Sequence, residues 1–198
     1  MTALGTHYVE DTSSWEDWQR DYRLGVILIL PPPEVSRAID MLRRRHDPQA
    51  FRIAPAHISV SDPLQLEMTP RLDQEVREIL RDTEPFTLHY DAPHASMEHP
   101  GVAYPITPQE PIDDLKQALH RAAAFAGKVY RRRDIPAHMT IAEFISIDDG
   151  LRLCAQLRET APSGSFLCDR LTLVVPDADF RFHPQVTYRL GSSVKGSH

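Results

Sequence analysis

The chain has 198 residues and an ordinary apolar content, which is enough for one large domain or a two-lobed unit. Its formal net charge of −6 argues against a broad electrostatic hold on long nucleic acid, although a local basic patch would suffice for a short nucleotide. The two cysteines, Cys154 and Cys168, are too few for a disulfide framework and lack zinc or redox spacing. No secretory signal is recognisable, and the longest apolar stretch, residues 25–30, is far too short to span a membrane. We therefore expect a cytoplasmic protein with reduced thiols.

The first half of the chain predicts an extension followed by alternating strands and helices. Residues 1–21 are polar and irregular, but Trp15, Trp18 and Tyr22 are spaced for one face of a helix capped by Ser13 or Ser14. These rings would dock the extension on the core; a role as a lid is the alternative. Hydrophobic periodicity then predicts a strand over 24–30, a helix over 34–45, a strand over 51–61 and a helix over 70–82. Arg43, Arg44 and Arg45 are expected at the exposed end of the first of these helices, where positive charge suits the dipole.

The second half of the chain repeats the order of strand, helix, strand and helix. Strands are predicted over 86–90 and 102–107, around a loop over 94–101 in which His94 and His99 are exposed. A helix over 111–126, a short strand near 128–130 and a strand over 136–145 follow. Asp148 or Asp149 would cap a helix ending near Glu159, and strands over 166–175 and 180–190 would be joined by a turn at 176–179.

The repeated order of elements predicts an internal duplication. We expect one α+β domain over 22–191 with two comparable lobes rather than two independent domains, because no low-complexity linker divides the chain. Residues 192–198 are expected to be a flexible tail, whose last three residues resemble the remnant of a tag.

Two near-copies of one short pattern are the most informative feature of the chain. They read Pro-Ala-His-Ile-Ser-Val over residues 55–60 and Pro-Ala-His-Met-Thr-Ile over residues 136–141. In a strand, side chains alternate between faces, so His57 shares a face with Ser59, and His138 shares one with Thr140. The two strands side by side would offer a cleft with two imidazoles and two hydroxyls. Such a set suits a phosphodiester, because hydroxyls can donate to phosphoryl oxygens while histidines transfer protons.

The paired pattern of histidine, apolar residue, serine or threonine and apolar residue resembles the 2H phosphoesterase superfamily. This group includes the RNA 2′,3′-cyclic phosphodiesterases, also called 2′-5′ RNA ligases and LigT-like proteins. The resemblance covers about residues 22–191 and looks closest to the YjcG-like branch, on the stretches 25–28, 43–48 and 186–191 and on the first motif. It implies two lobes, each with an antiparallel sheet and helices outside, around a central groove. It also implies His57 and His138 as the catalytic pair, Ser59 and Thr140 as phosphate ligands, and no metal.

One departure from the family pattern and two sets of candidate residues outside the motifs bear on the substrate. Where the RNA ligase branch commonly has an arginine after the second motif, this chain has Glu143, and an acid there would repel a phosphate-rich polymer. Arg131 and Arg133, in the basic run before the second motif, are candidates for pairing with a phosphate, and a solvated loop is the equal alternative. Tyr104 is a candidate for stacking a base, although half-buried packing is favoured for a tyrosine in a strand.

Two histidines with ordinary imidazole chemistry can supply the acid and the base that hydrolysis of a phosphodiester needs. The sequence therefore predicts a metal-independent phosphodiesterase that acts on 2′,3′-cyclic or 2′-5′ nucleotide or RNA bonds. The expected partner is a small nucleotide or an RNA end, with no membrane, no obligate protein partner, no cofactor and a monomeric state. A non-catalytic nucleotide-binding module, a metal-dependent hydrolase with histidine ligands, and ligation by the reverse reaction are the alternatives.

Overall fold

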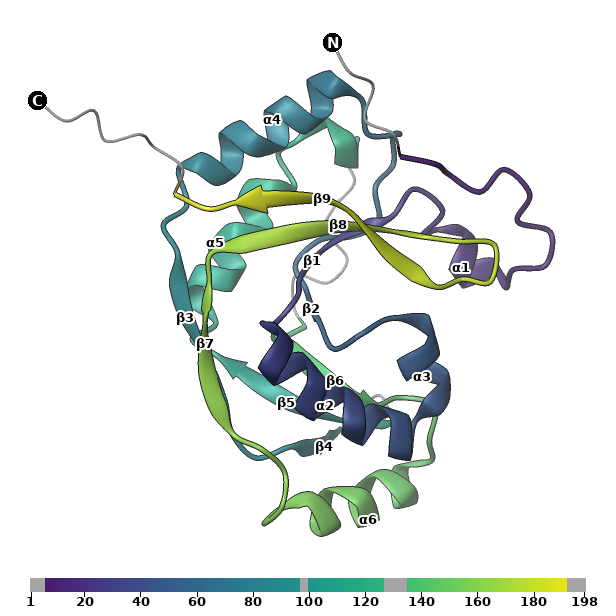
Figure 1. The fold of residues 1–198 in the computed structure, drawn as a ribbon, viewed down its shortest axis with the longest axis vertical. Coiled ribbons are helices and arrows are strands. Elements are labelled where there is room, and N and C mark those ends of the chain that lie inside the picture. The colour runs from purple at the N-terminus through teal and green to yellow at the C-terminus, as the bar shows by residue number, and fades with distance from the viewer. Residues whose placement is uncertain (1–5, 97–99, 127–134, 192–198) are drawn as a thin grey trace, which may run out of the picture.

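Two antiparallel β-sheets form the framework of the computed structural model, which describes residues 6–96, 100–126 and 135–191 (Figure 1). In the first sheet, strands β2, β1, β8 and β9 lie in that order and span Ile58–Ser59, Val26–Ile29, Arg170–Pro176 and Phe182–Arg189. The second sheet contains β3, β4, β5, β6 and β7, which span Phe86–Tyr90, His94–Ser96, Gly101–Thr107, His138–Ala142 and Gly164–Cys168. Its central strand β5 pairs with β3, β4 and β6, and β7 pairs with β3. The predicted α+β class with two antiparallel sheets is confirmed.

The predicted duplication is visible in the connections of the strands. Strand β1 is followed by helix α2 (Pro33–His46) and by β2, which pairs back on β1; β5 is followed by helix α5 (Glu110–Leu119) and by β6, which pairs back on β5. Leu28 faces Ser59 in the first pair and Ala103 faces Thr140 in the second. The two hydroxyl residues of the motifs therefore occupy matching register positions in the two lobes.

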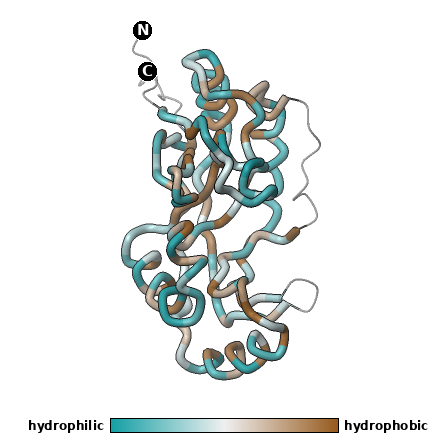
Figure 2. Tube along the Cα trace, turned by 90° about the vertical axis from the view of Figure 1, so that its right-hand side faces the viewer, coloured by the Kyte–Doolittle hydropathy of each residue, from teal (hydrophilic) through white to brown (hydrophobic). Residues whose placement is uncertain are grey.

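The longer helices, α2, α4 (Pro70–Arg81), α5 and α6 (Ile147–Leu157), pack on the sheets or on one another and each buries one face. Helix α4 begins where Thr69 accepts a hydrogen bond from the amide of Leu72, and its buried residues follow the helical repeat. It lies against α5 and β9, whereas α2 lies against β6 of the second sheet (Figure 1). Figure 2 shows apolar segments along the central strands and alternating polar and apolar segments in the helices. Most buried apolar residues of both sheets form one connected core, and Val26, Leu28 and Val174 of the first sheet form a second, smaller cluster.

The chain crosses from one sheet to the other at Asp169. Residues 164–168 pair with β3 in the second sheet, and residues 170–176 pair with β1 and β9 in the first. The single strand predicted over 166–175 is therefore two strands in different sheets (Figure 1). Because this segment belongs to both sheets, it fixes one lobe relative to the other.

Several predicted boundaries are wrong for local reasons. Residues 48–53 form helix α3 (Pro48–Ile53) instead of the start of a strand, because Asp47 caps the amide of Ala50 and Pro48 stands at the first helical position. Strand β2 is consequently short. The predicted loop over 94–101 contains β4. The helix predicted to end at Ala126 ends at Leu119 and is followed by a 3₁₀ turn, η1 (Ala123–Phe125).

Two helix caps also differ from the prediction. Ser146 rather than an aspartate caps helix α6 (Ile147–Leu157), through a hydrogen bond that its hydroxyl accepts from the amide of Asp149. Helix α1 is only Asp17–Arg20 and is capped by Glu16, so Trp15 and Tyr22 lie just outside it. The short strand predicted near 128–130 lies outside the described residues. Cys154 and Cys168 are both free thiols, as predicted, and burial raises the pKa of Cys168 to about 12.

Candidate active site

Both motifs adopt the alternation that the sequence predicts. Ala56, Ile58 and Val60 are buried in the core while His57 and Ser59 are half-buried, and Met139 and Ile141 are buried while His138 and Thr140 are half-buried. These four polar residues line one cavity of about 350 Å³. Strands β2 and β6 lie next to each other where the two lobes meet, which brings the two motifs together. The structure thus gathers in one place two imidazoles and two hydroxyls that are far apart in sequence.

The two imidazoles are held by matching backbone contacts. His57 Nδ1 lies 2.7 Å from the carbonyl oxygen of Pro55, and His138 Nδ1 lies 2.9 Å from the carbonyl oxygen of Pro136. A carbonyl oxygen can only accept a hydrogen bond, so Nδ1 of each ring must carry a hydrogen. Each neutral ring therefore has its lone pair on Nε2, and each protonated ring has an acidic N–H there. Either histidine can then act as base or as acid through Nε2.

The alanine amide before each histidine is fixed by a helix-associated side chain, which the sequence did not reveal. Asp40 in α2 accepts a hydrogen bond from the amide of Ala56 at 2.8 Å. Gln109, which caps α5, accepts one from the amide of Ala137 at 2.9 Å and donates to the carbonyl oxygen of Ala137 at 3.2 Å. Asp40 and Gln109 thus have equivalent roles in the two lobes. They are positioning residues, because they orient the motif backbone without lining the cavity.

Arg43 corrects a prediction made from the sequence. It was expected at the exposed end of a helix, but only 1% of its surface is exposed. Its Nη1 donates to the carbonyl oxygen of Thr140 at 2.6 Å, and its Nη2 donates to the carbonyl oxygens of Ala50 and Ala54 at 2.9 and 3.0 Å. Burial lowers the pKa of this guanidinium, and the carboxylates of Glu143, Asp40 and Asp47 oppose the change. Arg43 therefore ties α2 and α3 to the second motif.

Asp47 makes a second tie between α2 and the end of β6. Its Oδ2 accepts hydrogen bonds from the amides of Glu143 and Phe144 at 2.8 and 3.0 Å, and its Oδ1 accepts the amide of Ala50. Only 3% of Asp47 is exposed. The carboxylate fixes the turn that carries Glu143 and Phe144 to the edge of the cavity, which both residues line. No local pattern in the sequence predicts this contact, because it joins residues far apart in the chain.

The remaining candidates from the sequence do not gather at the cavity. Tyr104 is fully buried in β5, in edge contact with Tyr90, and its hydroxyl has no hydrogen-bond partner among the described residues. Burial raises the pKa of this phenol. The prediction that Tyr104 stacks a base is therefore wrong, and the favoured packing interpretation holds. Arg131 and Arg133 lie outside the described residues.

Next to the first motif, His120 ties α5 to the chain just after β2 and should make stability depend on pH. Its Nε2 accepts a hydrogen bond from the amide of Asp62 at 3.0 Å, and its Nδ1 lies 2.6 Å from the carbonyl oxygen of Lys116. Burial lowers the pKa of the ring. Below pH about 6.5 the imidazole of His120 is therefore protonated to a greater extent in the unfolded chain than in the folded chain. The free energy of unfolding consequently falls as pH falls.

The slope due to His120 should approach at most about 1.4 kcal/mol per pH unit below pH 6.5. Urea unfolding measured from pH 7.5 to 5 tests this, with His120→Gln as the matched variant, because glutamine can accept the same amide but does not titrate there. The difference between wild type and variant should vary with pH below 6.5 and be constant above it. A constant difference throughout would show that His120 does not titrate differently on folding.

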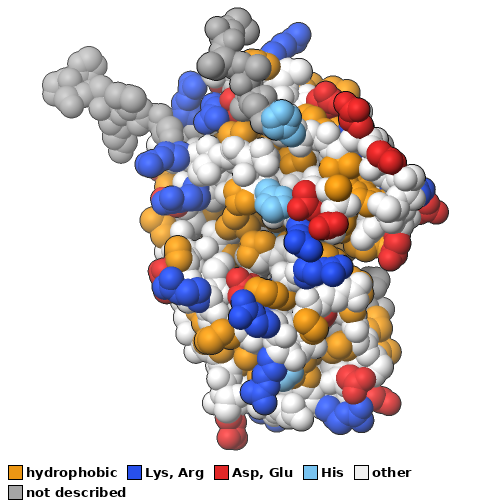
Figure 3. Space-filling model, turned by 45° about the vertical axis from the view of Figure 1, so that its right-hand side comes forward, with side chains coloured by type: hydrophobic (Ala, Val, Ile, Leu, Met, Phe, Trp, Pro, Cys, Tyr) orange, Lys and Arg blue, Asp and Glu red, His pale blue; other side chains and the backbone are white. Residues whose placement is uncertain are grey.

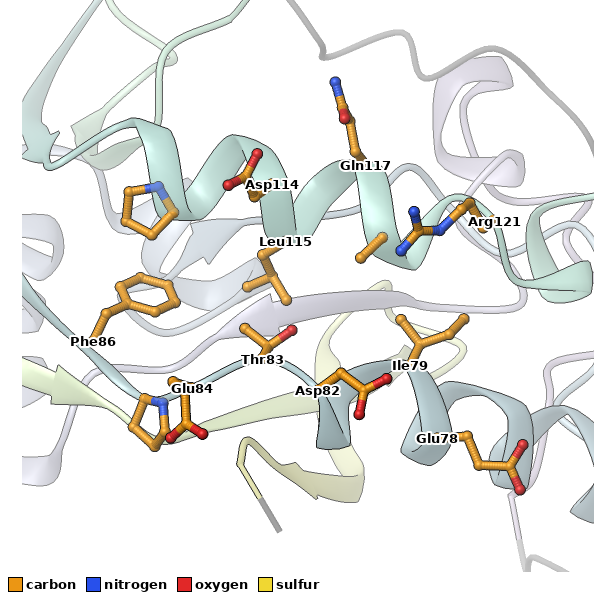
Figure 4. A pocket seen from close by; sticks show the side chains of 13 residues that line it. Glu78, Ile79, Asp82, Thr83, Glu84, Phe86, Asp114, Leu115, Gln117 and Arg121 are labelled. Carbon is orange, nitrogen blue, oxygen red and sulfur yellow. The ribbon is translucent and has the colours of Figure 1, made fainter. Parts of the chain in front are cut away.

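A second, larger hollow of about 820 Å³ lies between α4 and α5 and contains none of the motif residues. Figure 4 shows its acidic side chains, Glu78, Asp82, Glu84 and Asp114, with Arg121 as the labelled cation. This charge does not suit a phosphate ligand. On the face shown in Figure 3, acidic and basic side chains are interspersed with apolar ones.

Within the described residues, no group of three or more histidine, cysteine, aspartate or glutamate side chains is arranged to hold a metal ion. In the same part of the chain, no helix is long and apolar enough to cross a membrane.

Comparison with known proteins gives one family and one fold. The family model described as the 2′-5′ RNA ligase superfamily matches residues 31–180. Escherichia coli LigT in complex with 3′-AMP superposes with a TM-score of 0.55 at 19% identity, over 83% of this chain and 96% of that one. LigT in complex with NADP⁺ gives a TM-score of 0.52 at 18% identity, over 83% and 95%. A further structure described as a phosphoesterase gives 0.55 at 19% identity, over 83% and 96%. No curated protein matches the sequence.

Proposed function

Because the chain belongs to the 2′-5′ RNA ligase superfamily, also known as the 2H phosphoesterases, we propose that it is a metal-independent phosphodiesterase. Its substrates are 2′,3′-cyclic or 2′-5′ nucleotide or RNA phosphodiester bonds. The observation that carries the proposal is the matched pair of histidines, each with Nδ1 held by a backbone carbonyl and each lining the same cavity. The nucleotide complexes of LigT support a nucleotide as ligand of this fold.

Hydrolysis of a cyclic phosphodiester follows from this geometry. One neutral imidazole accepts a proton from water at Nε2 while the water oxygen forms a bond to phosphorus. The bond between phosphorus and one ribose oxygen breaks, and the other imidazole, protonated, gives its Nε2 proton to that oxygen. The product is a nucleoside monophosphate with a free neighbouring hydroxyl. The two rings return to their starting states by exchanging protons with solvent. The near-symmetry of the contacts leaves the assignment of base and acid open.

Ser59 and Thr140 donate hydrogen bonds to the non-bridging oxygens in this scheme as charge develops on the phosphoryl group. We expect Ser59→Ala and Thr140→Val each to lower kcat by about 10²-fold, because each removes one donor to the transition state. Ser165→Ala, which removes an exposed hydroxyl in β7 away from the cavity, is the matched control and should leave kcat unchanged. Equal rates for wild type and the Ser59 and Thr140 variants would remove the hydroxyls from the mechanism.

The test of the proposed function is hydrolysis of the four 2′,3′-cyclic nucleotides and a 2′-5′ dinucleotide in the presence of EDTA. The expected result is conversion to nucleotide products whose rate EDTA does not change. Activity that disappears with EDTA and returns with added metal would overturn metal independence. Absence of turnover, together with nucleotide binding measured by calorimetry, would instead establish the alternative, a non-catalytic nucleotide-binding module.

A further inference from the structure

One end of the catalytic cavity is formed by aromatic side chains. Four aromatic lining residues, Trp18, Tyr22, Phe180 and Phe182, are in mutual ring contact and form this end, and Phe144 lines the cavity beside Glu143. Among the described lining residues, Glu143 is the only aspartate, glutamate, lysine or arginine. A volume of about 350 Å³ is in the range of small-molecule sites and suits a single nucleotide. The cavity therefore has a polar end for a phosphoryl group and an aromatic end for a flat, uncharged group.

The aromatic end is built largely from segments outside the part of the chain that matches the family. The match covers residues 31–180, whereas Trp18 and Tyr22 precede it and Phe182 follows it. Trp18 belongs to α1 in the N-terminal extension. This end of the cavity is therefore a feature of this chain that family membership does not assign.

Phe180 connects the extension to the hairpin between β8 and β9. The centroid of its ring lies 5.1 Å from the ring centroid of Trp15, 5.2 Å from that of Trp18 and 5.3 Å from that of Phe182, and all three pairs have edge-to-face geometry. Its φ of +58° is in the left-handed region, which is uncommon for a bulky residue. Asp177 holds the turn by accepting hydrogen bonds from the amides of Asp179 and Arg181. The hairpin thus places the Phe180 ring at the centre of the aromatic cluster, which comprises Trp15, Trp18, Tyr22, Phe180 and Phe182.

Trp18 is the member of the cluster that remains accessible. Its surface is 43% exposed, and its ring meets Phe180 and Tyr22 at interplanar angles of 87° and 83°, so neither ring lies flat on it. Its indole N–H donates to Glu16 at 2.7 Å, which fixes the orientation of the ring. Trp15 is by contrast buried, and its indole N–H donates to the carbonyl oxygen of Ala178, which anchors the extension to the hairpin. The indole of Trp18 is therefore an oriented, accessible flat surface at the edge of the cavity.

We propose that Trp18 is a nucleobase-stacking residue and that the protein acts on a single or terminal nucleotide whose base stacks against it. The proposal rests on the proposed function and names its substrate class. Stacking on an aromatic side chain accepts every base, so it predicts weak discrimination among the four bases. Glu143 at the same cavity disfavours further phosphates, which restricts the ligand to a mononucleotide or a chain end.

The test compares a cyclic phosphate with a base and one without it. Trp18→Ala should lower kcat/KM for 2′,3′-cyclic nucleotides by roughly 5- to 150-fold, mainly through KM, because stacking is lost. The same variant should hydrolyse 1-O-methylribose 2′,3′-cyclic phosphate at the wild-type rate. Trp18→Phe should restore most of the activity on the nucleotides. Leu66→Ala removes a similarly exposed apolar side chain (45%) away from the cavity and should change neither rate.

Two outcomes would overturn the stacking site: equal losses on both substrates, or no loss on either. A binding measurement separates this from failure of the proposed reaction. Trp15 and Trp18 are the two tryptophans of the chain and Trp15 is buried, so quenching of fluorescence by 3′-AMP that occurs in the wild type and is lost in Trp18→Phe reports stacking directly. Quenching by 3′-AMP in a protein that hydrolyses neither ester would overturn the reaction and support the stacking site. Hydrolysis without quenching would support the reaction and overturn the stacking site.

Discussion

Replacing His57 or His138 with alanine is expected to lower kcat for a 2′,3′-cyclic nucleotide by about 10²–10⁴-fold in each case. Each imidazole has its Nδ1 held by a carbonyl and can exchange protons only through Nε2, so each variant loses one proton transfer in the proposed mechanism. The double variant should be far less impaired than the product of the single effects, because groups that act as a unit are not additive. Initial rates in EDTA measure these effects.

Chemical rescue and pH dependence distinguish lost chemistry from lost structure. Added imidazole should restore part of the activity of each alanine variant, because it supplies the missing proton acceptor or donor to the vacated space. The wild-type rate should be bell-shaped in pH, since one ring must be neutral while the other is protonated. His89→Ala, which removes an exposed histidine from β3, should leave the rate unchanged. A flat wild-type pH profile would contradict a two-histidine mechanism.

The features that could be predicted from the sequence are those set by local periodicity and repetition. Alternation of apolar and polar residues in both motifs was enough to place His57 with Ser59 and His138 with Thr140 on one face. The repeated order of elements was enough to predict the duplication and its two lobes, and the resemblance to the 2H phosphoesterases implied an antiparallel sheet in each. The order of elements did not indicate that the segment around Asp169 divides into strands of two different sheets, because the break depends on tertiary pairing.

The features that could not be predicted depend on contacts between distant segments. Asp40 and Gln109 occupy unremarkable helix and cap positions, and only the fold brings them to the amides of Ala56 and Ala137. Arginines at the end of a helix usually face solvent, and although Arg43 continues the four-residue spacing of the buried Val35 and Ile39, a charged side chain at that position does not by itself predict burial. Trp15, Trp18 and Tyr22 were expected to dock the extension, and Trp15 does so, but the position of Trp18 and Tyr22 at the cavity depends on Phe180 and Phe182 from the other end of the chain.

Arg43→Met is expected to lower the free energy of unfolding by about 3–5 kcal/mol. The substitution leaves the carbonyl oxygens of Thr140, Ala50 and Ala54 without the guanidinium donor. It also removes the cation near the carboxylate of Asp40, which lies 3.6 Å from Arg43 Nε. Burial already raises the pKa of Asp40, so that carboxylate becomes still harder to keep charged. Urea unfolding at neutral pH measures the loss.

Arg45→Met is the matched control, because it removes an exposed arginine from the same turn of α2 and should change stability by less than about 0.5 kcal/mol. Arg43→Lys should recover only part of the loss, since a single ammonium cannot reproduce a planar fork whose two terminal nitrogens reach carbonyls in α3 and β6. Equal stability of the Arg43→Met and Arg45→Met proteins would show that the buried guanidinium does not hold the two lobes together. Arg43 donates a hydrogen bond to the carbonyl oxygen of Thr140, so the position of the second motif depends on it. A folded Arg43→Lys protein should therefore also show a lower kcat.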